Sequence, residues 1–254
     1  MPSMEAVNLK FEWARHHFEL FKSEVAKYMR VNPCRFVPNP DIFIDAEGQG
    51  WVTGKFIVSI PIPTHVPHVL GDCIGNLRYS LDYLVWELVG AFGNQPTRKN
   101  AFPICLTPGE FAGELKRHRL DGIDPAAIAI IEGIQPYHRG NDAPKAFLAI
   151  LNEFTNINKH RRVLLATLKT SHPTSDLQVV DGQPYALVNP PTSQGDAEFG
   201  PFRVIGDQVE VKAQVIAYIV FNEAPADGFE IISMVEGIAN YINTCVLPRF
   251  ERFF

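Results

Sequence analysis

The sequence lacks the paired cysteines, the long apolar runs and the positive charge that mark several large classes of protein. Its four cysteines are widely spaced without a C-x-x-C pair, which disfavours both a zinc knuckle and a disulfide framework. No segment reaches the ~18 apolar residues of a membrane span, and the amino terminus carries scattered charges instead of a signal sequence. The formal net charge of -5 disfavours a general nucleic-acid-binding protein, although a local basic patch stays open. We therefore expect a cytoplasmic protein without a membrane segment.

The chain has 254 residues and a hydrophobic content of 46%, which is enough to bury a sizeable core. We find no internal repeat, low-complexity tract or domain linker. The sequence therefore predicts a single domain over residues 1–254. Helical and β-rich segments alternate within it: helical core 1–31, 67–170 and 228–254, and β-rich segments 33–61 and 176–223.

The segment from Val69 to Phe92, VLGDCIGNLRYSLDYLVWELVGAF, carries the strongest helical pattern in the chain. Large apolar residues recur at spacings of three and four, so that they share one narrow stripe of a helix. The stripe consists of Leu70, Ile74, Leu77, Leu81, Leu84 and Leu88. We expect this stripe to be buried and the rest of the helical core to form around it.

Two further kinds of pattern set the predicted fold class. Helical spacing recurs over residues 4–30, 143–169 and 229–250, whereas β-branched and aromatic runs around the turn-rich AEGQG predict a hairpin within 33–61. The expected fold is α+β: a bundle of about four long helices packed with an antiparallel sheet, formed by the N-terminal hairpin and C-terminal strands. A parallel sheet interleaved among the helices would contradict this expectation.

Polar residues flank the leucine stripe of the predicted helix at residues 67–92. Arg78 and Asp82 stand one helical turn apart, where they can form an ion pair along the helix surface. Such a pair either clamps an anion or locks the helix to a neighbouring segment, a role that buried charges fill when they are paired. Gly71 and Gly75 share this flank and favour the close approach of another backbone.

A second polar stripe is predicted on the helix at residues 143–169. Asn152, Asn156, Lys159 and His160 share one side of that helix, opposite its Leu and Phe residues. We expect the two polar stripes to face each other, because inward polar groups need partners. A solvated helix face is the alternative. The candidate ligand-binding residues are Asn76, Arg78, Asp82, Tyr83, Asn156, Lys159 and His160.

Patterns for metal, cofactor and nucleophile chemistry are weak. His65-x-x-His68 lies in a proline-rich segment, and His16 and His17 are adjacent on a helix, where neighbouring side chains point about 100° apart. No nucleophile-elbow pattern occurs, and no cysteine has a local histidine partner. We therefore expect neither a metal site nor a cofactor.

Four motifs occur in a fixed order: GDCIGNLRYSLDYLVWEL, then FPI, then QPY, then NINKHR. With them the chain resembles, over nearly its whole length, a family of uncharacterised bacterial proteins. The helical core also resembles, more remotely, the HEPN helical domains. That second resemblance implies RNase activity from an arginine followed, after four to six residues, by a histidine on one helix. Arg78 matches the arginine, whereas Tyr83 stands where relatives often have the histidine.

Two functions follow as hypotheses. The favoured function is non-catalytic binding of a small anionic ligand or a protein partner, with a homodimer left open. The alternative is a metal-independent RNase that uses Arg78 and His160, and a nucleic acid is a partner only under this alternative. RNA cleavage needs a base for the 2′-hydroxyl and a cation for the phosphorane, and tyrosine is a poor base at neutral pH. Tyr83 therefore weighs against catalysis.

Overall fold

The computed structural model describes residues 2–31, 33–160, 166–171, 198–205, 208–210, 216–221 and 229–254. The fold class is α+β with a helical core, as the sequence predicts. Two compact units are present: a helical unit of residues 1–24, 64–165 and 221–254, and a sheet unit of residues 25–63 and 166–220. The expectation of one domain over residues 1–254 stays a prediction.

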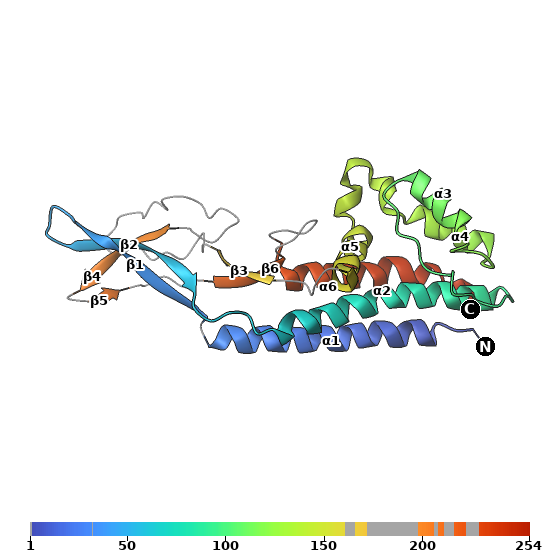
Figure 1. Ribbon diagram of the computed structural model, residues 1–254, viewed down its shortest axis with the longest axis horizontal. Helices are drawn as coiled ribbons and strands as arrows, with labels where there is room; N and C mark the ends of the chain where they lie inside the picture. The colour runs from blue at the N-terminus through green and yellow to red at the C-terminus, as the bar shows by residue number, and fades with distance from the viewer. Residues whose placement is uncertain are drawn as a thin grey trace. The chain divides into compact units, whose positions relative to one another are not determined.

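Two long helices, α1 (Glu5–Arg30) and α2 (His65–Ala91), run side by side in opposite directions (Figure 1). The backbone N–H of Ser3 donates to Glu87 Oε2 over 3.1 Å, close to the end of α2. The predicted stripe on α2 is buried, and none of its side chains is more than 2% exposed: Leu70, Ile74, Leu77, Leu81, Leu84 and Leu88. Burial of this apolar stripe is the main driving force that the sequence provides for the helical unit.

Two short helices follow α2, and a local cap starts each of them. Helix α3 (Pro108–Lys116) begins at Thr107, whose hydroxyl accepts the backbone N–H of Glu110 over 3.1 Å. Helix α4 (Pro125–Gly133) begins at Asp124, whose carboxylate accepts the backbone N–H of Ala126 over 2.8 Å. Both helices have proline as their first residue, where the missing N–H costs nothing.

The helix expected at residues 143–169 differs from the observed structure at both ends. A 3₁₀ helix, η1 (Pro136–Lys145), precedes α5 (Phe147–His160), and β3 (Ala166–Ser171) follows it. The expectation of a helix up to residue 169 is therefore wrong. Strand β3 pairs with β6 (Ile216–Phe221), and this pairing overrides the helical spacing of the sequence.

The last helix is also less regular than expected over residues 229–250. Helix α6 (Ile231–Tyr241) continues as a π-helical turn, η2 (Ile242–Val246), and as a 3₁₀ turn, η3 (Leu247–Arg249). A further 3₁₀ turn, η4 (Glu251–Phe253), closes the chain. Pro248 lies in η3 and lacks the N–H that a continuing α-helix would need.

The sheet unit contains a four-stranded antiparallel sheet in the order β1-β2-β4-β5. The predicted hairpin supplies β1 (Cys34–Ile44) and β2 (Gly50–Val58), and later residues supply β4 (Glu198–Ile205) and β5 (Gln208–Glu210). Strand β1 carries two prolines, which an edge strand tolerates because one of its sides needs no ladder bonds. Of the expected β-rich segment 176–223, residues 176–197, 206–207, 211–215 and 222–223 lie outside the described residues.

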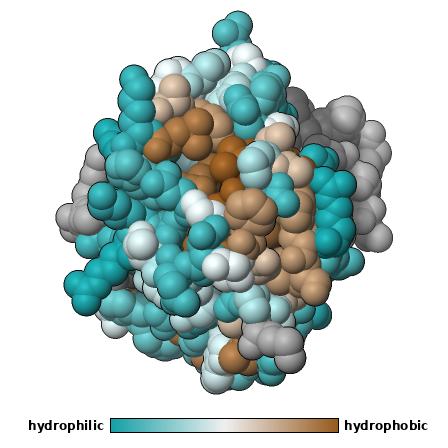
Figure 2. Space-filling view, turned by 90° about the vertical axis from the view of Figure 1, so that its right-hand side faces the viewer, coloured by the Kyte–Doolittle hydropathy of each residue, from teal (hydrophilic) through white to brown (hydrophobic). Residues whose placement is uncertain are grey.

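One end of the helical unit shows an apolar surface. Figure 2 views this end, and apolar side chains occupy the middle of the face with hydrophilic residues around them. Phe92, next to the end of α2, is 51% exposed, and the C-terminal Phe254 is 40% exposed. Within the described part of the chain, no helix combines the length and the apolar character needed to cross a membrane.

Candidate functional site

Arg78 and Asp82 form the ion pair that their spacing predicts, and together they bind one backbone residue. Arg78 Nη2 lies 3.2 Å from Asp82 Oδ1 and donates to the carbonyl oxygen of Phe102 over 2.7 Å. The same Asp82 oxygen accepts the backbone N–H of Phe102 over 2.9 Å. Both polar backbone groups of a residue outside helices and strands are thereby satisfied. The pair locks the segment around Phe102 onto α2.

Burial sets the electrostatics of Arg78, whose side chain is only 12% exposed. Burial lowers the pKa of the guanidinium, the charge of Asp82 opposes this, and the charges of Arg119 and Glu114 make smaller, opposite contributions. Arginine nevertheless stays protonated in proteins. The second terminal nitrogen, Nη1, is buried and has no hydrogen-bond partner within the described residues.

Gln135 holds the residues that follow Phe102. Its side chain is buried, and its Nε2 donates to the carbonyl oxygens of Pro103 over 3.0 Å and of Ile131 over 2.9 Å. Its Oε1 accepts the backbone N–H of Cys105 over 2.9 Å. We call Arg78, Asp82 and Gln135, with the segment 102–105 that they hold, the Phe102 clamp.

The Phe102 clamp gives three of the sequence motifs a shared structural role. The NLR and LD residues of α2 bind the first residue of the FPI motif, and the glutamine of the QPY motif binds the second. Hydrogen bonds to buried backbone groups are costly to lose, because the partner is left unsatisfied. The spacing of these motifs along the chain therefore reflects contacts among them.

Gly71 provides space for a side chain from α5. A Cβ atom at Gly71 would lie 2.7 Å from Asn158 Oδ1, too close for a real contact. The nearest neighbour of Gly75 is Tyr79 of its own helix, 3.8 Å from an added Cβ. The expected close approach of another backbone on this flank is therefore wrong, because the neighbour of Gly71 is an asparagine side chain.

Aromatic residues occupy the outer side of α2, and two lysines contact them. Lys159 Nζ lies 5.8 Å from the ring centre of Tyr79, whereas Lys10 Nζ lies 5.9 Å from Tyr79 and 5.5 Å from Tyr83. These distances are typical of cation–π contacts. Tyr79, Tyr83 and Trp86, which we call the aromatic surface, are between 40% and 45% exposed.

The other predicted ligand-binding residues lie on the two helices α2 and α5. Asn76 Nδ2 donates to the carbonyl oxygen of Asp72 over 2.9 Å within α2, and Asn156 is exposed on α5. His160 ends α5, and its side chain lies outside the described residues. The described contacts join α5 to α2 through Asn158 and Lys159, and they do not bring Arg78 or Asp82 to Asn156. A site shared with His160 stays a prediction.

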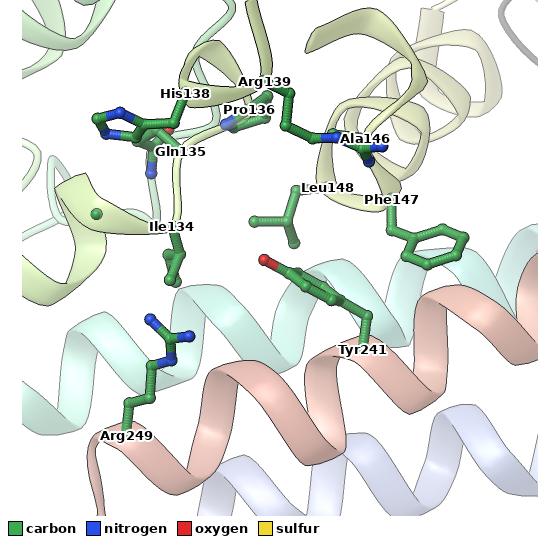
Figure 3. A pocket seen from close by; sticks show the side chains of 11 residues that line it. Ile134, Gln135, Pro136, His138, Arg139, Ala146, Phe147, Leu148, Tyr241 and Arg249 are labelled. Atoms are coloured by element: carbon green, nitrogen blue, oxygen red, sulfur yellow. The ribbon is translucent and has the colours of Figure 1, made fainter. Parts of the chain in front are cut away.

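A pocket of about 180 Å³ is also present in the helical unit, and Gln135 of the Phe102 clamp is one of its lining residues. Figure 3 shows its walls: residues at the end of α4 and in η1, the start of α5, and residues of α6 and η3. Arg139 and Arg249 approach it from different elements, and the hydroxyl of Tyr241 points between them in this view. Its apolar lining includes Ile134, Pro136, Phe147 and Leu148.

The two arginines of this pocket are exposed and have no ion-pair partner among the residues that the structure describes. Asp142, near Arg139 in the chain, pairs instead with Lys145 over 3.0 Å. Burial raises the pKa of the Tyr241 hydroxyl, as does the charge of Cys245, against the opposing charges of Arg249 and Arg139. The tyrosine therefore stays a hydrogen-bond donor throughout the neutral range.

Sequence reasoning missed Arg139, Tyr241 and Arg249. The first lies just after the QPY motif in an irregular 3₁₀ segment, and the third lies in a 3₁₀ turn near the C-terminus. Neither segment has a period that predicts where a side chain points. The proximity of Arg139 to QPY was the only local signal.

The described residues contain no group of three or more His, Cys, Asp or Glu side chains that could hold a metal ion. His65 Nε2 lies 2.9 Å from Glu24 Oε2. Cys73, Cys105 and Cys245 are free thiols, and burial raises the pKa of Cys73 to about 12. A thiol with a raised pKa is a weak nucleophile at neutral pH.

Comparisons of the chain with protein-family models, with curated proteins and with solved structures find no match. The resemblance to the bacterial family and to HEPN domains therefore rests on the motifs quoted above. Two features of the helical unit remain for a functional interpretation: the Phe102 clamp with the neighbouring aromatic surface, and the pocket with Arg139 and Arg249.

Proposed function

We propose that this protein is a non-catalytic binding protein with a HEPN-like helical core, which acts in the cytoplasm of a bacterium. The observation that carries this proposal is the occupation of Arg78 by its own chain. Its Nη2 is bonded to the Phe102 carbonyl oxygen and paired with Asp82. A phosphorane would have to reach the buried Nη1 of Arg78 or displace the partners of Nη2, and Asp82 and the Phe102 carbonyl would lose their own partner in the second case.

Tyr83 supports the same proposal. It stands where an RNase of HEPN type would have its histidine, and it is 41% exposed with Lys10 5.5 Å from its ring centre. A tyrosine hydroxyl is a poorer acceptor for the 2′-hydroxyl proton at neutral pH than a histidine imidazole. The outer side of α2 thus offers an aromatic contact area, with a tyrosine in place of the histidine that an RNase of HEPN type would have.

The aromatic surface suggests how a protein partner would bind. Tyrosine and tryptophan give large contact areas at low entropic cost and dominate the energetics of many interfaces. Lys10 and Lys159 beside these rings favour an acidic partner. A small anionic ligand is the second proposed kind of partner, and a homodimer is the third.

The alternative function, a metal-independent RNase using Arg78 and His160, makes an opposite prediction. One observation favours it: Arg78 Nη1 is free of partners among the described residues.

An RNA cleavage assay tests the two functions. Purified protein is incubated with structured and with single-stranded RNA, with and without a chelator. We expect no cleavage.

Variants make that experiment decisive. Chelator-resistant cleavage that is lost in both Arg78→Lys and His160→Ala would overturn the proposal and establish the RNase. Arg78→Lys keeps a cation beside Asp82, so that loss of activity is separable from loss of folding, which circular dichroism checks. Cleavage that persists in both variants would indicate a contaminating nuclease, and the prediction of no intrinsic activity would stand.

A further inference from the structure

We propose that the pocket between η1 and α6 binds a small organic anion, whose oxyanion lies between Arg139 and Arg249 and whose short apolar body contacts Ile134 and Leu148. This inference rests on the proposed binding function and names a ligand class for it. None of the residues that carried the sequence-based site prediction lines this pocket.

The charge of the lining is the first reason. The chain has a net charge of -5, yet the ionisable side chains that line this pocket are His138, Arg139, Arg249 and Tyr241, with no Asp or Glu. Guanidinium groups present planar forks that match a carboxylate or phosphate with two hydrogen bonds. Two such groups on one pocket give a local positive potential in an acidic protein.

The absence of internal partners is the second reason. Arg78 in the same unit is bonded within the chain, whereas the part of the chain that the structure describes offers no ion pair to Arg139 or Arg249. The carboxylate closest to Arg139 in the sequence, Asp142, has its pKa lowered mainly by its hydrogen bond to Lys145, with Arg139 a minor contributor. Both guanidinium forks therefore remain available to a ligand.

The third reason is the placement of a neutral donor beside the cations. Tyr241 ends α6, and the π-helical turn Ile242–Val246 separates it from Arg249. Turns of this kind are rare and occur frequently at functional sites. The Tyr241 hydroxyl points into the space between the two arginines in Figure 3, where it can donate to an oxyanion.

The apolar wall and the size of the pocket limit the ligand. Ile134 and Leu148 are buried side chains at the wall, and Phe147 lies beside them. A volume of about 180 Å³ is below the roughly 300–1,000 Å³ of sites for drug-sized ligands. A benzoate-sized molecule combines an apolar body with one anionic head and suits this lining.

Isothermal titration of the full chain tests the proposal with four probes: benzoate, phenyl phosphate, inorganic phosphate and benzamide. We expect both organic anions, benzoate and phenyl phosphate, to bind. Inorganic phosphate lacks the apolar body and benzamide lacks the charge, so each is expected to bind at least ~10-fold more weakly.

Variants locate the binding. Arg139→Ala and Arg249→Ala are each expected to weaken binding of the better organic anion by ~10-fold or more, and Tyr241→Phe by a smaller factor. Arg252→Ala is the matched control, because Arg252 is an exposed arginine in η4 that does not line the pocket. It is expected to leave affinity unchanged.

Three results would overturn the inference: no binding of either organic anion, equal binding of benzamide, or equal losses in Arg252→Ala and Arg249→Ala. If inorganic phosphate bound as tightly as phenyl phosphate, the ligand would need no apolar body. These outcomes concern this pocket alone. RNA cleavage, by contrast, would overturn the proposed non-catalytic function without changing the affinity of the pocket.

Discussion

Arginine serves two different purposes in two regions of the helical unit. In the Phe102 clamp, Arg78 is 12% exposed and is bonded to the Phe102 carbonyl oxygen and to Asp82. In the pocket, Arg139 and Arg249 are exposed, and neither has an ion-pair partner within the described residues. The partners of a cation, more than its residue type, separate a structural role from a binding role.

The comparison also separates what the protein needs to fold from what it offers to a ligand. The hydrogen bonds of the clamp join α2 to residues 102–105 and to Gln135, so their loss leaves buried groups unsatisfied. Arg139 and Arg249 are exposed, and among the described residues no ion pair depends on either of them. Substitutions in the two regions should therefore differ in their effect on stability.

Asp82→Ala is expected to have the largest effect. It removes the acceptor of the Phe102 N–H and leaves Arg78 buried without its counter-charge. Because Asp82 is 29% exposed, we expect a loss of about 2–3 kcal/mol, below the roughly 3–5 kcal/mol of a fully buried pair. Urea unfolding measures the loss, and a change below ~0.5 kcal/mol, typical of surface sites, would contradict the clamp.

Gln135→Leu is expected to cost slightly less. The new side chain is close in size but leaves the Pro103 carbonyl and the Cys105 N–H without partners, at about 1–3 kcal/mol in total. Gln95→Leu is the matched control at an exposed position. Equal midpoints of urea unfolding for the two variants would show that Gln135 does not hold the segment.

Gly71→Ala tests the contact between α2 and α5. In an open helix, glycine to alanine gains roughly 0.5–1 kcal/mol, and Gly113 in α3 provides that control because nothing lies near its added Cβ. At Gly71 the gain is offset, since Asn158 Oδ1 would lie 2.7 Å away. The midpoint temperature of thermal unfolding should therefore rise for Gly113→Ala and not for Gly71→Ala. A rise in both variants would mean that the Asn158 side chain moves away from the added methyl group at little cost.

The smallest effect on stability is expected in the pocket. Arg139→Ala and Arg249→Ala should change the free energy of unfolding by no more than about 0.5 kcal/mol, since both side chains are exposed. The same urea experiment as for Asp82→Ala measures this. A loss of more than ~1.5 kcal/mol in the free energy of unfolding of either variant would mean that this arginine, like Arg78, has a structural role.

Much of the helical core could be predicted because it depends on periodic patterns. The leucine stripe of α2 and the pairing of Arg78 with Asp82 both follow from helical spacing. The residue that this ion pair binds could not be predicted. Almost every residue has a backbone N–H and a carbonyl group, so the sequence does not show that those of Phe102 are the ones bound. Spacing therefore identified the ion pair but not what it binds.

Two other features lay beyond periodic patterns for different reasons. Residues 166–171 have helical spacing yet form β3, because pairing with β6, distant in the sequence, decides the conformation. Arg139 and Arg249 line one pocket from 3₁₀ segments that are far apart in the chain. Only the fold brings such residues to one pocket.

Hydrogen exchange at the backbone N–H of Phe102 tests the central claim most directly. Phe102 lies outside helices and strands, where amides normally exchange quickly, yet its N–H donates to Asp82 over 2.9 Å in a buried setting. We predict exchange slowed by ~100-fold or more relative to an unprotected amide. Exchange at the unprotected rate would contradict the clamp and return Arg78 to the candidates for ligand binding.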